Sequence, residues 1–227
     1  IVQNRLLQLA LWQQLQALDT ATLRVGVTLG ALEQESDAVL LRLSDGCSIC
    51  SRLVLGADGA NSQTRRLAHI GVSQWDYRQA CLLINVDIAG EQQDITWQQF
   101  TPAGPRAFLP LAGSHGSLVW YDTPERIREL EALSPSQLAE QIRAHFPSRL
   151  PEFCVTGCGS FPLTRRHALR YVSGRVVLLG DAAHTIHPLA GQGVNLGFGD
   201  VTDLCQRITT AIEAKLPWDA SSLLGAY

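Results

Sequence analysis

Two short hydrophobic runs that end in Gly and Asp constrain the fold of this sequence most. Residues 53–59 (LVLGADG) and residues 175–181 (RVVLLGD) are both typical of a buried parallel strand that delivers its last side chain to a cleft at its carboxyl end. Taken singly, the first run is equally well explained as a plain turn. Together they predict that Asp58 and Asp181 face one crevice, which suits a ligand with ribose hydroxyls and a diphosphate.

A glycine-rich segment follows the second run and also indicates a ligand-binding site. Missing side chains let a ligand approach backbone N–H groups that have no partner within a helix, and the opening of a helix favours negative charge. The segment lies at the start of the last predicted helix and contains Gly191, Gln192, Gly193, Val194, Asn195 and Gly197.

A metal site is the competing interpretation of this segment. Asp181, His184 and His187 are ligand types, and histidines three apart share a helical face. Pro188 pushes His187 out of helical geometry, however, so we expect no metal there. The two histidines then either fix the loop or tune a phenol proton, and we favour the positional role.

The remaining pattern predicts one helix followed by strands. Apolar residues at three- and four-residue steps predict a helix over residues 4–18 that buries one stripe. Apolar runs predict three strands over residues 23–55, with a hairpin turn at 44–46, and a separate antiparallel sheet over 76–122.

Helices and a second set of strands complete the chain. Thr-Pro and Ser-Pro start signals predict two short helices over residues 123–133 and 134–146 that close the inserted lobe. Strands return after residue 154, and the last helix covers about residues 193–215.

Composition excludes several classes of protein. With 227 residues, 46% hydrophobic and 17% charged, the chain is an ordinary globular protein. The net charge of −3 and the lack of a basic run argue against nucleic acid. No apolar run reaches the roughly 18 residues of a membrane span, and the start does not resemble a signal peptide. We therefore expect a soluble protein of a reducing compartment, with its six cysteines as buried free thiols.

Both motifs resemble those of a known family. Residues 58–65 (DGANSQTR) resemble the DG motif, and residues 180–197 (GDAAHTIHPLAGQGVNLG) the GD motif, of the group A flavoprotein aromatic monooxygenases. The segments WQQFTPAGPRAFLPL, SLVWYDTPERIREL, HFPSRL and FPLTRRHAL are similar to its ubiquinone-biosynthesis hydroxylase branch. The resemblance covers essentially the whole chain.

The resemblance implies an α/β fold, with a partial Rossmann-like FAD/NAD(P)-binding domain and an inserted antiparallel-sheet substrate domain. Residues 1–72 would be the first part of the FAD-binding domain, 73–153 the inserted lobe and 154–227 the second part. The implied function is hydroxylation of a polyprenyl benzoquinol or phenol in ubiquinone biosynthesis through a C4a-hydroperoxyflavin, with FAD as cofactor and NAD(P)H and O₂ as co-substrates. The implied location is cytoplasmic, and a peripheral position on the inner membrane face and a ubiquinone-biosynthesis protein complex stay open.

The resemblance also implies roles for individual residues. Asp181 would bond the ribityl or ribose hydroxyls, Pro188 would lie over the flavin with His187 nearby, and no residue is assigned to catalysis. The backbone of residues 191–193 would face the pyrimidine edge, where the helix start stabilises negative charge. The cofactor-binding set is Asn4, Asp58, Gly59, Ser62, Arg65, Gly180, Asp181, Pro188, Gly191, Gln192, Gly193 and Asn195.

The substrate would meet an apolar wall on the inserted sheet. The side chains assigned to it are Trp97, Phe100, Phe108, Pro110 and Trp120. Aromatic residues in strands belong to a core more often than to a pocket, so a core role is the alternative.

One part of the family pattern is missing from these 227 residues. They contain no strand-GxGxxG-helix unit for the FAD diphosphate, no helical C-terminal part and no methionine. We therefore expect a fragment, the middle of a longer enzyme, that is inactive alone; whether it binds FAD stays open. The alternatives are a non-catalytic fragment or scaffold in a biosynthetic complex, and a reductase or halogenase of the same fold.

Overall fold

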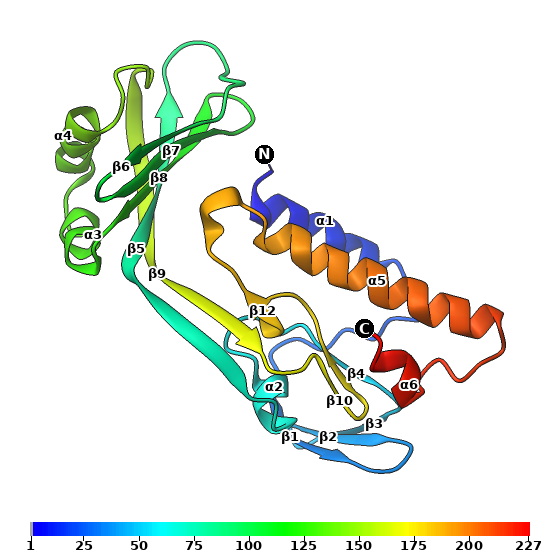
Figure 1. Ribbon diagram of the computed structural model, residues 1–227. Coiled ribbons are helices and arrows are strands. Elements are labelled where there is room, and N and C mark those ends of the chain that lie inside the picture. The colour runs from blue at the N-terminus through cyan, green and yellow to red at the C-terminus, as the bar shows by residue number, and fades with distance from the viewer. Residues whose placement is uncertain (1) are drawn as a thin grey trace. The chain divides into compact units, whose positions relative to one another are not determined.

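The computed structural model describes residues 2–227, except for the side chains of Ala190 and Ser221. The chain divides into two compact units, whose elements are labelled in Figure 1. Unit 1 comprises Ile1–Leu23 and Asp76–Leu163, and unit 2 comprises Arg24–Trp75 and Thr164–Tyr227. The domain boundaries expected from the sequence stay a prediction.

Unit 1 is built on an antiparallel sheet, as its sequence pattern predicts. Side chains of β5 alternate between buried and exposed from Leu82 to Ile88, which is the period of a strand with one face on a core. Neighbouring strands follow the order β9-β5-β8-β7-β6. Their bounds are β5 (Val72–Ile88), β6 (Trp97–Thr101), β7 (Gly104–Pro110), β8 (His115–Asp122) and β9 (Phe153–Ala168).

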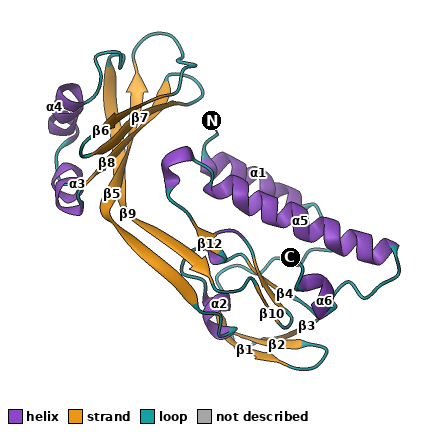
Figure 2. Cartoon of the chain, in the orientation of Figure 1, coloured by secondary structure: helices purple, strands orange, loops and turns teal. Residues whose placement is uncertain are grey.

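Two helices cover one face of this sheet, and Figure 2 shows both on the same side. They are α3 (Pro124–Glu131) and α4 (Pro135–His145), and both predicted start signals are confirmed. The Thr123 side chain caps α3, and Ser134 forms a capping box with Gln137 at α4. The fully buried centre between helices and sheet contains Leu82, Ile84, Phe108, Leu118, Trp120, Ile127, Leu130, Leu138 and Ile142.

Unit 2 contains two small sheets. The first has the order β1-β2-β3, with β1 (Leu29–Gln34), β2 (Val39–Leu43) and β3 (Ser48–Ser51) all antiparallel. The predicted turn between β2 and β3 is confirmed, and Gly46 adopts a φ of 83° there. The second has the order β10-β11-β4, with β10 (Val172–Ser173), β11 (Val176–Leu178) and β4 (Val54–Gly56). The stretch predicted to hold three strands therefore holds four.

Further helices are α1 (Asn4–Gln16) in unit 1, and α5 (Gly193–Glu213) and α6 (Ser221–Leu224) in unit 2. The predicted helix near the start is confirmed as α1, but its expected buried stripe is wrong, because no side chain of α1 is buried. Periodicity specifies a helix, and it does not specify the surface that covers it. No helix of residues 2–227 is long and apolar enough to cross a membrane.

The expectation of buried thiols is also wrong for most of the cysteines. Cys81, on β5 in the core of unit 1, is buried, and burial raises its pKa to about 12. The other cysteines are exposed: Cys47, Cys50, Cys154, Cys158 and Cys205.

Candidate functional site

The two Gly-Asp motifs of unit 2 lie at the same edge of one sheet. Strands β4 and β11 are parallel neighbours, and Gly56 at the end of β4 pairs with Leu178 at the end of β11. The backbone N–H of Leu179 donates to the carbonyl of Gly56 over 2.9 Å. Because β4 and β11 both end at the carboxyl edge of the sheet, Asp58 and Asp181 follow adjacent strand ends, where α/β proteins commonly bind ligands.

The first loop, which we call the DG loop (residues 57–62), is held by its own acid. Thr64 donates to Oδ2 of Asp58 from its backbone N–H (2.9 Å) and from its hydroxyl (3.0 Å), and Ser62 donates to Oδ1 (2.5 Å). Burial alone would raise the pKa of Asp58, but the hydrogen bonds from Ser62 and Thr64 outweigh it and the pKa is lowered. Ser62 in turn accepts from the N–H of Arg65 and caps α2 (Gln63–Leu67).

Arg65 joins the DG loop to the second motif. Arg65 is 6% exposed, and its guanidinium donates to the carbonyl of Ala182 (2.7 Å) and to the carbonyl of Ala60 (2.9 Å). Burial, followed by the nearby charge of Arg166, lowers its pKa. In residues 2–227 these hydrogen bonds of Arg65 therefore hold the DG loop and the second motif together.

The second loop, which we call the GD loop (residues 179–185), leaves its acid free. It contains the one-turn helix η1 (Gly180–Ala182), entered by Gly180 at a φ of 57°, and the short strand β12 (His184–Thr185), which pairs with β9. Within residues 2–227 the exposed carboxylate of Asp181 makes no hydrogen bond or ion pair.

Asp200 on α5 holds the GD loop in place of Asp181. Its Oδ2 accepts from the N–H of Gly180 over 2.7 Å and lies 2.8 Å from Nε2 of His184. Because a carboxylate only accepts, Nε2 of His184 carries the proton, and its buried Nδ1 has no partner in the described structure. Sequence reasoning missed Asp200, since an acid inside a helix usually faces solvent.

Close backbone approach explains one glycine of the motif. A Cβ on Gly197 of α5 would meet the Cα of Gly180 at 3.2 Å, so a side chain there would push the helix away from the loop.

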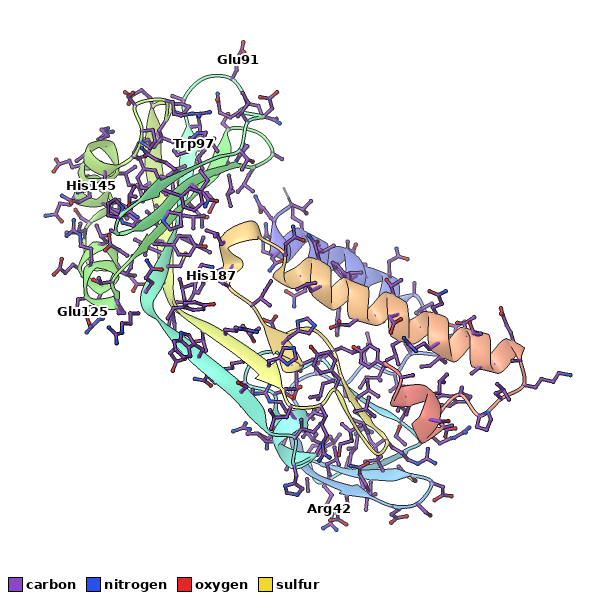
Figure 3. The ribbon with its side chains drawn as sticks, in the orientation of Figure 1. Arg42, Glu91, Trp97, Glu125, His145 and His187 are labelled. Carbon is purple, nitrogen blue, oxygen red and sulfur yellow. The ribbon has the colours of Figure 1, made fainter. Side chains whose placement is uncertain are left out.

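The start of α5 is open. Its N-cap Gln192 makes no side-chain cap hydrogen bond, the first turn holds no acid, and a Cβ on Gly191 or Gly193 would meet nothing within 4 Å. The first N–H groups of a helix have no partner inside it. His187 precedes this turn, as labelled in Figure 3; its Nδ1 accepts from the N–H of Leu189, and burial lowers its pKa.

The other residues assigned from the resemblance lie elsewhere. Asn4 is exposed on α1 and belongs to unit 1. Of the substrate wall, Trp97, Phe108 and Trp120 are packed in the core of unit 1, so the structure favours the core interpretation for them; Figure 3 labels Trp97 within that sheet. Phe100 is 72% exposed, and Pro110 is half-buried. No group of three His, Cys, Asp or Glu that could hold a metal occurs in the described residues.

Comparison with known proteins identifies the family. The family model described as "FAD binding domain" matches residues 1–227, so the chain belongs to the FAD binding domain family, and FAD is its cofactor. The chain is 52% identical over 227 residues to 3-demethoxyubiquinol 3-hydroxylase of Escherichia coli strain K12, covering 100% of this chain and 58% of that protein. It is 38% identical over 228 residues to ubiquinone hydroxylase UbiL of Rhodospirillum rubrum, covering 100% of this chain and 53% of that protein.

A solved structure gives the same fold. The p-nitrophenol 4-monooxygenase PnpA of Pseudomonas putida DLL-E4 superposes with a TM-score of 0.80 at 19% identity, over 100% of this chain and 58% of that one. The α/β fold class implied by the resemblance is therefore confirmed. The chain spans about half the length of the curated relatives it matches.

Proposed function

We propose that this chain is part of an FAD- and NAD(P)H-dependent monooxygenase that uses O₂ to hydroxylate the ring of a polyprenyl benzoquinol or phenol in ubiquinone biosynthesis. The observation that carries the proposal is the 52% identity, along the whole chain, to a ubiquinol-precursor hydroxylase. The geometry supports it, because the free acid and the open helix start lie on adjoining segments of unit 2.

The residues of unit 2 fit a flavin nucleotide. Asp181 has an unpaired carboxylate that would accept hydrogen bonds from sugar or ribityl hydroxyls. The uncapped N–H groups at Gly193 would hold a negatively charged ring edge, and the absence of side chains at Gly191 and Gly193 lets that ring approach the backbone. When bound, FAD supplies the reaction with O₂ and the electrons taken from NAD(P)H.

The DG loop contributes by holding this site, in the proposal. Arg65 links the carbonyls of Ala60 and Ala182, so the end of β4 fixes the backbone beside Asp181. His187 lies before the start of α5 with a lowered pKa, which keeps the imidazole neutral beside a flavin near pH 7.

Partner and place are finer parts of the proposal. A polyprenyl tail is apolar, which supports a peripheral position of the enzyme on the inner membrane face. The proposal includes association with other ubiquinone-biosynthesis proteins. Fractionation of cells that carry a tagged copy, followed by identification of co-purified proteins, measures both; recovery of the protein alone and wholly in the soluble fraction would contradict this part.

Exchange of Asp181 for Ala tests the site. In the full-length protein this variant should lose most of the flavin absorbance while its free energy of unfolding stays unchanged, because the carboxylate has no partner in the chain. Asp37→Ala, at the exposed bend between β1 and β2, is the matched control and should keep FAD. Retention of full flavin absorbance by Asp181→Ala would contradict the assignment.

Labelled O₂ tests the reaction. A monooxygenase places one labelled oxygen atom in the ring of the quinol product, whereas a reductase or a halogenase of the same fold places none. Oxidation of NAD(P)H with an unlabelled product would therefore replace the proposed reaction by one of these.

A further inference from the structure

In unit 2, the start of β5 lies beside the end of β9, and β12 pairs with the other edge of β9. The two faces of the β5–β9 part, which we call the ribbon, have different roles. The N–H of Leu169 donates to the carbonyl of Gly71 (2.9 Å), and Nε of Arg166 donates to Oε1 of Gln74 (3.0 Å), which sets the register. Since side chains alternate along a strand, Gln74 and Arg166 share one face. The opposite face, which we call the Trp75 face, carries Ser73, Trp75, Arg165 and His167.

The face with Arg166 serves the fold. Besides Gln74, its guanidinium donates to Oδ1 of Asn61 (2.6 Å) and to the carbonyl of Ala60 (3.1 Å). This arginine thus ties the ribbon to the DG loop, and its hydrogen bonds explain its presence.

The Trp75 face has no such structural explanation. A cavity of about 190 Å³ is lined by the four residues of this face, Ser73, Trp75, Arg165 and His167, together with Gln74. The Trp75 ring is 69% exposed, although exposing so large an apolar group is unfavourable. Within residues 2–227 neither Arg165 nor Ser73 makes a side-chain hydrogen bond or ion pair, whereas His167 is bonded to the hydroxyl of Tyr171 (3.0 Å).

The two segments that meet at the cavity are rich in arginine. Residues 62–76 and 164–170 contain five arginines and one acid, Asp76, in a chain whose net charge is −3, and Arg165 is the arginine that lines the cavity. A local excess of positive charge attracts anions, and a free guanidinium binds phosphate oxygens in pairs.

We propose that the Trp75 face binds an adenine nucleotide, with the base stacked on Trp75 and a phosphate held by Arg165. An adenine nucleotide offers a flat ring for the exposed indole of Trp75 and an anion for the unpaired guanidinium of Arg165. The hydroxyl of Ser73 adds a contact for a sugar or phosphate. The inference rests on the proposed function, because it identifies the ligand as the ADP-ribose half of NAD(P)H. FAD itself is assigned to the loops that follow β4 and β11.

Titration of the FAD-loaded, full-length protein with ADP-ribose tests this, because FAD occupies its own site and the probe has no nicotinamide. We expect Trp75→Ala and Arg165→Gln each to weaken binding about tenfold, and Trp75→Phe to restore most of it. The matched controls Trp12→Ala and Arg170→Gln should bind like the original protein. All four changed side chains are exposed, and the unfolding midpoint of each variant checks that it folds.

Two outcomes would overturn the inference. These are absence of ADP-ribose binding to the original protein, and binding of ADP-ribose by Trp75→Ala and Arg165→Gln with the affinity of the original protein. If the second outcome comes with loss of sedimentation of these variants on phosphatidylglycerol vesicles, the Trp75 face is a membrane contact instead. If the protein binds ADP-ribose tightly through Trp75 but does not hydroxylate the ring, the proposed function is wrong and the nucleotide site remains supported. If the protein hydroxylates the ring but the Trp75 and Arg165 variants bind ADP-ribose like the original protein, the nucleotide site is wrong and the proposed function remains supported.

Discussion

The DG loop and the GD loop begin at adjacent parallel strands, yet their acids differ in what they do. Asp58 is surrounded by donors from its own loop and from the start of α2. Asp181 meets no donor in the described structure, and Asp200 on α5 holds its loop instead. The same Gly-Asp signature thus marks a structural acid in one loop and a free acid in the other.

The difference can be traced to the residues that follow each acid. Asp58 precedes Ser62, whose hydroxyl donates to it, and Thr64, whose hydroxyl and N–H both donate to it. Asp181 precedes two alanines that offer no side-chain donor. A free acid at a strand end is available to a ligand, and an acid with three bonds is not. In the proposed site Asp181 would therefore contact FAD, while Asp58 shapes its own loop.

The largest expected effect on stability is that of Asp200→Ala. It removes two hydrogen bonds to a carboxylate and leaves the partly buried N–H of Gly180 and the buried imidazole of His184 unpaired, which costs about 3 kcal/mol of unfolding free energy. Asp181→Ala should change it by less than about 0.5 kcal/mol. Urea unfolding of both variants measures the contrast.

Asp200→Asn is the control, because an amide oxygen in the place of Oδ2 still accepts from both Gly180 and Nε2 of His184 while the negative charge is lost, and about half of the destabilisation should remain. Equal unfolding free energies for Asp200→Ala and Asp181→Ala would show that Asp200 does not hold the loop.

How far the sequence predicts this arrangement depends on the range of the interaction. The strands, the caps at Thr123 and Ser134, and the two motifs follow from local patterns, because each is decided within a few residues. Asp200 and the pairing of Arg65 with Ala182 depend on contacts 16 to 117 residues apart, which no local pattern encodes. The aromatic side chains show the same limit. Alternation identifies the buried face of a strand, but the sequence does not tell whether a residue on that face packs in a core or lines a pocket.

Asp58→Ala should have the next largest effect, a loss of about 2 kcal/mol, since the carboxylate caps the entry to α2 but is partly exposed. Thermal or urea unfolding gives the value. Ser62→Ala removes one donor to Asp58 and the side-chain acceptor for the N–H of Arg65, so we expect about half of this loss. If Asp58→Ala had the same unfolding free energy as Asp181→Ala, the two acids would not differ in their structural role.

Gly59→Ala and Gly191→Ala should each cost about 1 kcal/mol of unfolding free energy. Their φ angles are 78° and 62°, which disfavour a side chain, and a Cβ on either would meet nothing within 4 Å, so the cost comes from the backbone alone. The loss of unfolding free energy should therefore be similar for the two glycines, although the acids of the two motifs differ in their contacts. A loss above about 3 kcal/mol at Gly191 would mean that its surroundings are tighter than the structure shows.

The smallest expected effect is a dependence of stability on acid pH. Asp58 has a lowered pKa in the folded protein, so its contribution is present above the unfolded value of about 3.9 and is lost as the pH falls through the folded pKa. The pKa of Asp219 is lowered too, by Arg175 first, and it titrates in the same window. The informative quantity is therefore the difference between the original protein and Asp58→Asn. Unfolding free energies below about pH 4 should converge for the two proteins, because a protonated Asp58 resembles the amide, and parallel curves from pH 6 downward would show that Asp58 is not the group that titrates.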